Sequence, residues 1–484
     1  MSLQQFERNK HLLWRAGFGP AAEQISLLNS TNEEKVYQQL ERSSENADIL
    51  KVAGAGNIAD LMDGKENGDM SMQQKLSDAE RREIRRKSTE NIKKLNLLWI
   101  DTMVNSEAQL VEKMSLFWHG HFACRLSNYY YQQALINVIR KNALGNFGDL
   151  LKSVSTSAAM LQFLNNQQNK KQHPNENFAR EVMELFTMGR GHYTESDVKE
   201  AARAFTGWGS NLRGEFVFRK IFHDDESKTI LGRTGNFSGD DVLNILLEEK
   251  QTAFFITNKL YKYFVNNNVD EERVSALAND FYESNYDIKA LMRNIFTSDW
   301  FYDEKNIGAV IKSPVALLVG LRRALPMDMQ LAEMQLLIQR SLGQVLFYPP
   351  NVAGWPGGEN WIDSSTLMTR LRIPQMMQYD NVNISAKTDD DIQMGMQNEK
   401  ITRLKKVKDD TTGFADIHWE KFTKQFKKIS DKELYNTVHK VILQTANNKI
   451  DIGYAGVGSG KQSRDEYIQS IALALMCTPE YQMC

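Results

Sequence analysis

The feature that most constrains the fold is residues 175–208, in which charged and apolar residues recur at helical spacing. This pattern predicts two helices joined by a tight turn at residues 189–191, where two glycines flank an arginine. Thr194 and Asp197 have the three-residue spacing of a capping box, which predicts the start of the second helix. Apolar residues cover most of the perimeter of the first helix, so we expect it to be buried in a large core.

Helical patterns also run through most of the remaining chain, and they predict the fold class. Residues 215–223 are the one clear β stretch, and residues 228–231 are their expected pairing partner. We therefore predict a mainly α protein, a large multi-helix single domain with a small β-hairpin. This domain spans residues 1–484, with polar insertions near residues 53–90 and 385–430.

Composition narrows the class of protein. The chain has 484 residues, of which 42% are hydrophobic and 25% charged, as in an ordinary soluble globular protein. Its net charge of −2 provides no overall basic field, so we expect no nucleic-acid partner. No apolar run reaches the roughly 20 residues of a membrane helix, and the N-terminus lacks a signal peptide. We expect no membrane partner and a cytoplasmic location for the chain as written, or export if the natural gene has a longer N-terminus.

His119 and His121 are the best candidates for metal ligands. On a continuous helix, side chains two residues apart diverge by about 200°, so both could not face one ion. In an extended segment they would share a face, and Gly120 could end the helix between them. The alternative is that one histidine caps the helix or lies satisfied in the core.

The first helix of residues 175–208 carries a second candidate group. Glu176, Arg180 and Glu184 follow one another four residues apart, so they share a helix face. Buried carboxylates need a partner, and Arg203 of the second helix could supply one. These four residues could form a catalytic group, with an arginine that holds an anionic substrate, or a purely structural ion network.

A mixed metal site could join these regions. His223 and Asp225 have the His-x-Asp form of some iron sites. His223 or Asp224, joined to His119, His121 and Glu181, would give nitrogen and oxygen ligands suited to Zn, Fe or Mn.

The loop of residues 349–361 is rich in proline, glycine and tryptophan. Asn351, Trp355 and Trp361 could bind substrate there, because aromatic faces on an irregular loop can form a platform for sugars or peptides. The alternative is a rigid loop packed against the core.

Five segments in this order resemble the bacterial family catalogued as domain of unknown function 1800. They are residues 117–123, 174–181, 193–208, 228–232 and 349–358. The resemblance covers nearly the whole chain and implies one long, mostly helical unit, without established catalytic residues. It also implies a protein partner from a second uncharacterised family, similar to sulfatases and phosphatases, whose genes often lie beside those of this family.

From these patterns we predict a metal-dependent enzyme, hydrolytic or oxidative, whose metal polarises a substrate or activates water. The alternative is a non-catalytic helical scaffold that works with a partner enzyme.

Overall fold

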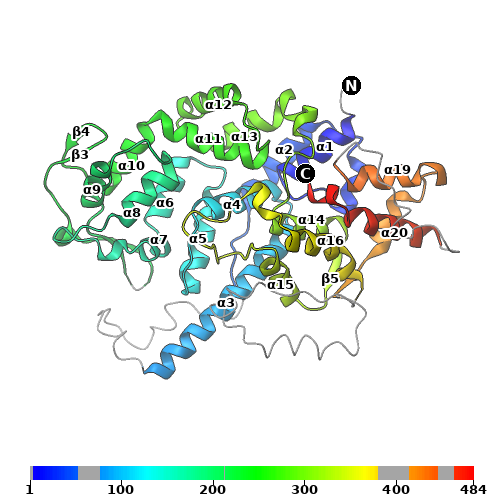
Figure 1. Ribbon diagram of the computed structural model, residues 1–484, viewed down its shortest axis with the longest axis horizontal. Helices are drawn as coiled ribbons and strands as arrows, with labels where there is room; N and C mark the ends of the chain where they lie inside the picture. Colours follow the sequence, from blue (N-terminus) through cyan, green and yellow to red (C-terminus); the bar gives the residue numbers. More distant parts are fainter. Residues whose placement is uncertain (1–3, 53–76, 212, 380–413, 445–462) are drawn as a thin grey trace.

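The computed structural model describes residues 4–52, 77–211, 213–379, 414–444 and 463–484. Helices predominate throughout these residues, so the predicted mainly α fold is confirmed (Figure 1). No helix in this described part combines the length and apolar composition needed to cross a membrane.

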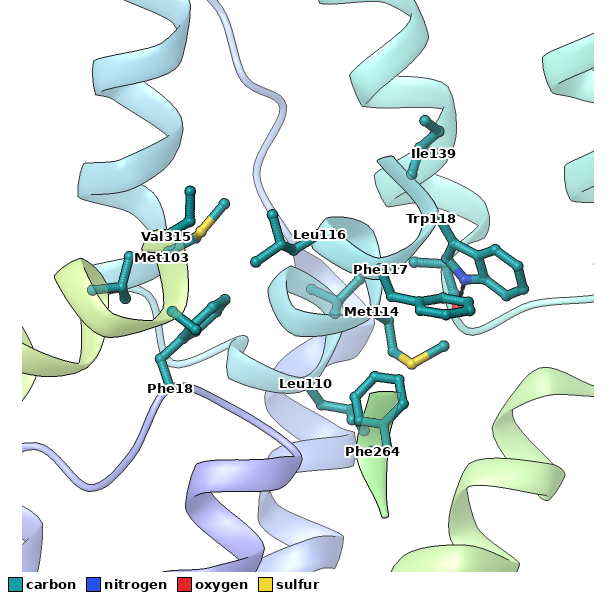
Figure 2. Close-up of a cluster of buried hydrophobic side chains, with 14 of the residues drawn as sticks. Phe18, Met103, Leu110, Met114, Leu116, Phe117, Trp118, Ile139, Phe264 and Val315 are labelled. Carbon is teal, nitrogen blue, oxygen red and sulfur yellow. Dashed lines mark hydrogen bonds between the residues drawn. The ribbon is translucent and has the colours of Figure 1, made fainter. Parts of the chain in front are cut away.

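Helix α4 (Gln109–His121) lies at the centre of the fold and is buried at nearly every position. Figure 2 shows its side chains Leu110, Met114 and Phe117 in one cluster with Phe264 and Val315. These two partners come from α11 (Lys250–Phe264) and α14 (Pro314–Ala324). The central helix therefore ties together segments about 150 to 200 residues apart in the chain.

The segment of residues 175–208 forms α8 (Glu176–Glu181), a π-helical turn (Val182–Thr187) and α9 (Glu195–Ala204). The predicted capping box is confirmed: the amide of Asp197 donates to the Thr194 hydroxyl at 3.2 Å, and the amide of Thr194 donates to the Asp197 carboxylate at 2.8 Å. The π-helical turn was not predicted. Its wider backbone alters the direction of the carbonyl groups that follow α8.

The described strands form three separate two-stranded antiparallel sheets. They are β1 (Trp208–Ser210) with β2 (Phe216–Phe218), β3 (Lys228–Ile230) with β4 (Arg233–Gly235), and β5 (Met327–Met329) with β6 (Ala415–Ile417). The prediction that residues 215–223 pair with residues 228–231 is wrong. Each segment pairs with a nearer strand across a short connection, and Leu231 and Gly232 have the positive φ angles of a tight hairpin turn.

The described part of the chain contains further α-helices. They are α1 (Gln5–Arg15), α2 (Glu33–Ser43), α3 (Asp78–Asn105), α5 (Tyr129–Asn142), α6 (Phe147–Ser155), α7 (Ala158–Phe163), α10 (Gly239–Glu248), α12 (Glu271–Glu283), α13 (Ile288–Thr297), α15 (Glu333–Ser341), α16 (Ser364–Gln378), α18 (Trp419–Thr423), α19 (Asp431–Ile442) and α20 (Arg464–Met476). Of the predicted insertions, residues 78–90 belong to α3 and residues 414–430 include β6 and α18, whereas residues 53–76 and 385–413 lie outside the described part.

Helices α1 and α20, the first and last α-helices of the described residues, lie on the same side of the molecule (Figure 1). The Lys10 ammonium of α1 donates to the carbonyl groups of Lys440 and Leu443, at the end of α19. The last residues pair with the segment before α14, since Val310 and Cys484 exchange two backbone hydrogen bonds. This pairing fixes residues 310–313, which line the cavity described next.

Candidate functional site

A cavity of about 670 Å³ lies where α4, α11, the start of α14 and the loop of residues 353–361 meet. We call it the basic pocket, because five of its lining residues are lysine or arginine, whereas its negative charge is limited to Glu359 and Cys484. The basic residues are Arg15, Lys113, Lys259, Lys262 and Lys312. Its aromatic lining residues are Phe117, Tyr263, Trp355 and Trp361.

Arg15 and Lys113 are two of the three cations on the buried floor of this pocket. Arg15 is 1% exposed, and its Nη2 donates to the carbonyl of Asn306 at 2.7 Å. Its Nε and Nη1 have no hydrogen-bond partner among the described residues. Lys113 is 6% exposed, and its amine makes one long hydrogen bond of 3.4 Å, to the carbonyl of Trp14.

Lys312 is the third cation and is 2% exposed. Its amine donates to the carbonyl of Tyr481 at 2.6 Å. It also lies 3.7 Å and 3.8 Å from the ring centroids of Trp14 and Tyr481. These ring faces partly replace the water that the ammonium group loses on burial.

None of the three floor cations forms an ion pair with a carboxylate of the described residues. Burial therefore lowers the pKa of Lys312 to about 7 and that of Lys113 to about 8, and negative charge at Cys484 only partly opposes this effect. Burial also lowers the pKa of Lys259, on the wall, to about 8. Positive charge without a partner is unfavourable in such a site, so an anion bound there would stabilise the folded protein.

The wall of the pocket depends on a close approach between two backbones. Gly354 adopts a φ of +83°, and a Cβ atom there would overlap the carbonyl oxygen of Gly120 in α4. Glycine alone combines this conformation with this contact. The approach holds the loop that carries Trp355 and Trp361 against the end of α4.

His119 anchors the same loop from inside the core. Its Nε2 accepts a hydrogen bond of 3.1 Å from the amide of Phe347, a residue in the left-handed region with a φ of +69°. The His119 ring also packs on Trp99, Phe347 and Trp355, with centroids 5.1 to 5.4 Å apart. Burial lowers the pKa of His119 to about 3, so its ring is neutral.

His121 points in a different direction and meets the π-helical turn. Its Nε2 donates to the carbonyl of Phe186 at 3.2 Å, which leaves Nδ1 as a buried nitrogen without a partner among the described residues. Burial holds the pKa of His121 well below its usual value. Helix α4 continues through both histidines, so their side chains diverge, as expected for a continuous helix.

The charged residues of α8 form surface and half-buried contacts away from the basic pocket. Arg180 pairs with Glu195 at 2.7 Å and with Glu176 at 3.2 Å. Glu184 accepts a hydrogen bond from the Tyr193 hydroxyl. Burial and the nearby Glu184 charge raise the pKa of Glu181.

Arg203 does not pair with these glutamates, which corrects the expected partnership. It lies 2.7 Å from Asp224 and 2.8 Å from Glu200, because α9 directs it toward the loop before β3. The Nδ1 of His223 donates to the carbonyl of Thr206 at 2.9 Å. The central helices therefore hold two separate ion-pair groups, one around Arg180 and one around Arg203.

The residues expected to bind a metal do not form one ligand set. Among the described residues, no group of three or more histidine, cysteine, aspartate and glutamate side chains could hold a metal ion. Of the five expected ligands, only His121 lines the basic pocket. Zn, Fe or Mn binding stays a prediction.

Of the expected substrate-binding residues, Trp355 and Trp361 line the basic pocket. Asn351 instead stabilises the turn before them by accepting a hydrogen bond of 2.9 Å from the amide of Ala353. Sequence reasoning missed the basic floor. One available signal was Lys113, a lysine next to Met114 within the apolar pattern of α4.

Comparison with known proteins identifies one family. A family model described as Protein of unknown function (DUF1800) matches residues 11–483, nearly the whole chain. No curated protein and no solved structure shows significant similarity to the chain.

Proposed function

We propose that this chain, which belongs to the DUF1800 family, binds an anionic organic molecule in its basic pocket. The observation that carries the proposal is the floor of Arg15, Lys113 and Lys312, three buried cations without a carboxylate partner among the described residues. Buried charges in proteins are normally paired, so a site that gathers three of them supports an anionic ligand.

Two further properties of the pocket support this ligand class. Its volume of about 670 Å³ lies within the range of small-molecule sites. Ser313, the N-cap of α14, and Ala316 in its first turn also line it, so the N-terminus of this 11-residue helix adds a partial positive charge.

The metal-dependent reaction and the sulfatase-like or phosphatase-like partner are not needed for this proposal. Binding of an anionic ligand is expected both for an enzyme, as its substrate, and for a non-catalytic protein, as its ligand. The metal and the partner therefore stay predictions with tests of their own.

Isothermal titration calorimetry with citrate, phosphate and sulfate, at matched ionic strength, tests the proposal. We expect saturable binding that is at least tenfold weaker in Lys113→Met and Lys312→Met. Lys228→Met is the matched control, since this buried lysine donates to the Asp224 and Glu226 carbonyl groups outside the pocket. Its anion affinity should stay within about twofold of the wild type.

Binding should also weaken as the pH rises from about 6.5 to 9, because Lys312 and Lys113 lose their protons in this range. Absence of saturable binding for all three anions, or equal affinity in the floor variants and the control, would overturn the proposal.

A further inference from the structure

We infer that the anionic ligand is a saccharide that carries one sulfate, phosphate or carboxylate group. This inference rests on the proposed function and adds the ligand class. It follows from the difference between the floor of the basic pocket, which is cationic, and its rim, which is rich in amide groups and aromatic rings.

The rim can hydrogen-bond to a ligand with many hydroxyl groups. Asn267, Asn268 and Asn360 are exposed lining residues, and Glu359 lies beside them. The side chains of Asn267, Asn268 and Glu359 have no hydrogen-bond partner within the described part of the chain. A carboxamide both donates and accepts, as a sugar hydroxyl does, whereas a bare anion uses only donors.

The Glu359 carboxylate also orients the ligand. A negative charge at the rim disfavours a second anionic group there, whereas it accepts hydrogen bonds from neutral hydroxyl groups. The charged group of the ligand therefore lies on the floor with Arg15, Lys113 and Lys312, and its hydroxyl groups lie at the rim.

Aromatic residues of the wall and rim provide the surface for a sugar ring. Trp355 is half-buried and backed by His119, with ring centroids 5.4 Å apart. Phe117 and Tyr263 stand together on the wall, with centroids 5.2 Å apart. The apolar face of a pyranose can pack on such rigid rings while its hydroxyl groups stay hydrogen-bonded.

Calorimetry with glucose 6-phosphate, N-acetylglucosamine 6-sulfate and glucuronic acid tests this inference and distinguishes the three anionic groups. Glucose, inorganic phosphate and inorganic sulfate are the reference ligands. We expect at least one charged sugar to bind tenfold more tightly than glucose and than the inorganic ions.

Variants of the rim separate the sugar from the anion. Trp355→Ala and Asn267→Ala should each weaken binding of that charged sugar about tenfold and leave binding of its inorganic ion within twofold. Trp355→Phe, which retains a ring, should restore most of the sugar affinity. Preserved binding of the inorganic ion shows that each variant is folded.

Two results would overturn the inference. If no charged sugar binds more tightly than its inorganic ion, or if the rim variants affect both equally, the saccharide class is wrong while the anion site stands. If neither sugars nor inorganic ions bind, the proposed function itself fails.

Discussion

Lys312→Met gives the sharpest physical test of the basic floor, because it removes one buried charge while keeping a similar volume. Burial lowers the pKa of Lys312 from 10.5 to about 7, so the folded protein releases a proton that the unfolded chain still holds. Between about pH 7 and pH 10.5 the unfolded state therefore binds more protons than the folded state. The contribution of Lys312 to the free energy of unfolding therefore rises with pH in this window and is least favourable below about pH 7.

The magnitude follows from the slope of this linkage, about 1.4 kcal/mol per pH unit for one proton. Between pH 7.5 and 9.5 the stability of the wild type should rise relative to Lys312→Met by about 2.5 kcal/mol, slightly below the full slope because some folded protein still holds the proton at pH 7.5. The variant also loses the hydrogen bond to the Tyr481 carbonyl and the contacts with the Trp14 and Tyr481 rings. These losses shift the difference between the two proteins at every pH but do not change its slope.

Urea unfolding of both proteins at pH 7.5, 8.5 and 9.5, at constant ionic strength, measures this difference. Lys262→Met is the control, because this lysine lies on the exposed rim of the same pocket. Its free energy of unfolding should differ from that of the wild type by the same amount at each of the three pH values. Parallel curves for Lys312→Met and the wild type would refute the argument that a buried, unpaired ammonium lies on the floor.

Four further predictions concern the tryptophan loop, the core, a helix cap and metal binding. Gly354→Ala should displace the tryptophan loop, because its Cβ would overlap the Gly120 carbonyl; unchanged tryptophan fluorescence would contradict this. His119→Ala should lower the free energy of unfolding by about 2–4 kcal/mol in urea titrations, since it opens a cavity and leaves the Phe347 amide unpaired, and a loss below about 1 kcal/mol would argue against this anchoring role. Thr194→Ala should cost about 1 kcal/mol through the lost helix cap, whereas Thr194→Ser should retain most of the stability. Elemental analysis, with thermal unfolding before and after EDTA, tests the metal prediction: stoichiometric Zn, Fe or Mn whose removal lowers Tm would confirm it, and absence of bound metal together with an unchanged Tm would contradict it.

The helical fold was predictable because its signals are local. The capping box at Thr194 and the recurrence of apolar residues every three to four positions act within one or two turns of helix. The partners of the short strands were not predictable from the same patterns. Three-residue strands carry little periodicity, and their pairing depends on the turns between them.

The site was only partly predictable for a similar reason. Trp355 and Trp361 stand out because proline and glycine surround them in an irregular loop. Arg15, Lys113 and Lys312 come from three segments roughly 100 to 200 residues apart, and only Lys113 stands out in its own segment, as a lysine within an apolar pattern. Only the tertiary arrangement shows that they share one cavity and lack carboxylate partners among the described residues.

The pairing of the last residues with the segment before α14 has a consequence for biosynthesis. The Lys312 amide donates to the Gln482 carbonyl and its amine to the Tyr481 carbonyl, so the floor is fixed only when these two residues are in place. At about 5–20 residues per second, Gln482 is made roughly 25 to 90 s after Arg15. The nascent chain therefore cannot complete its basic pocket until Tyr481 and Gln482 have been made.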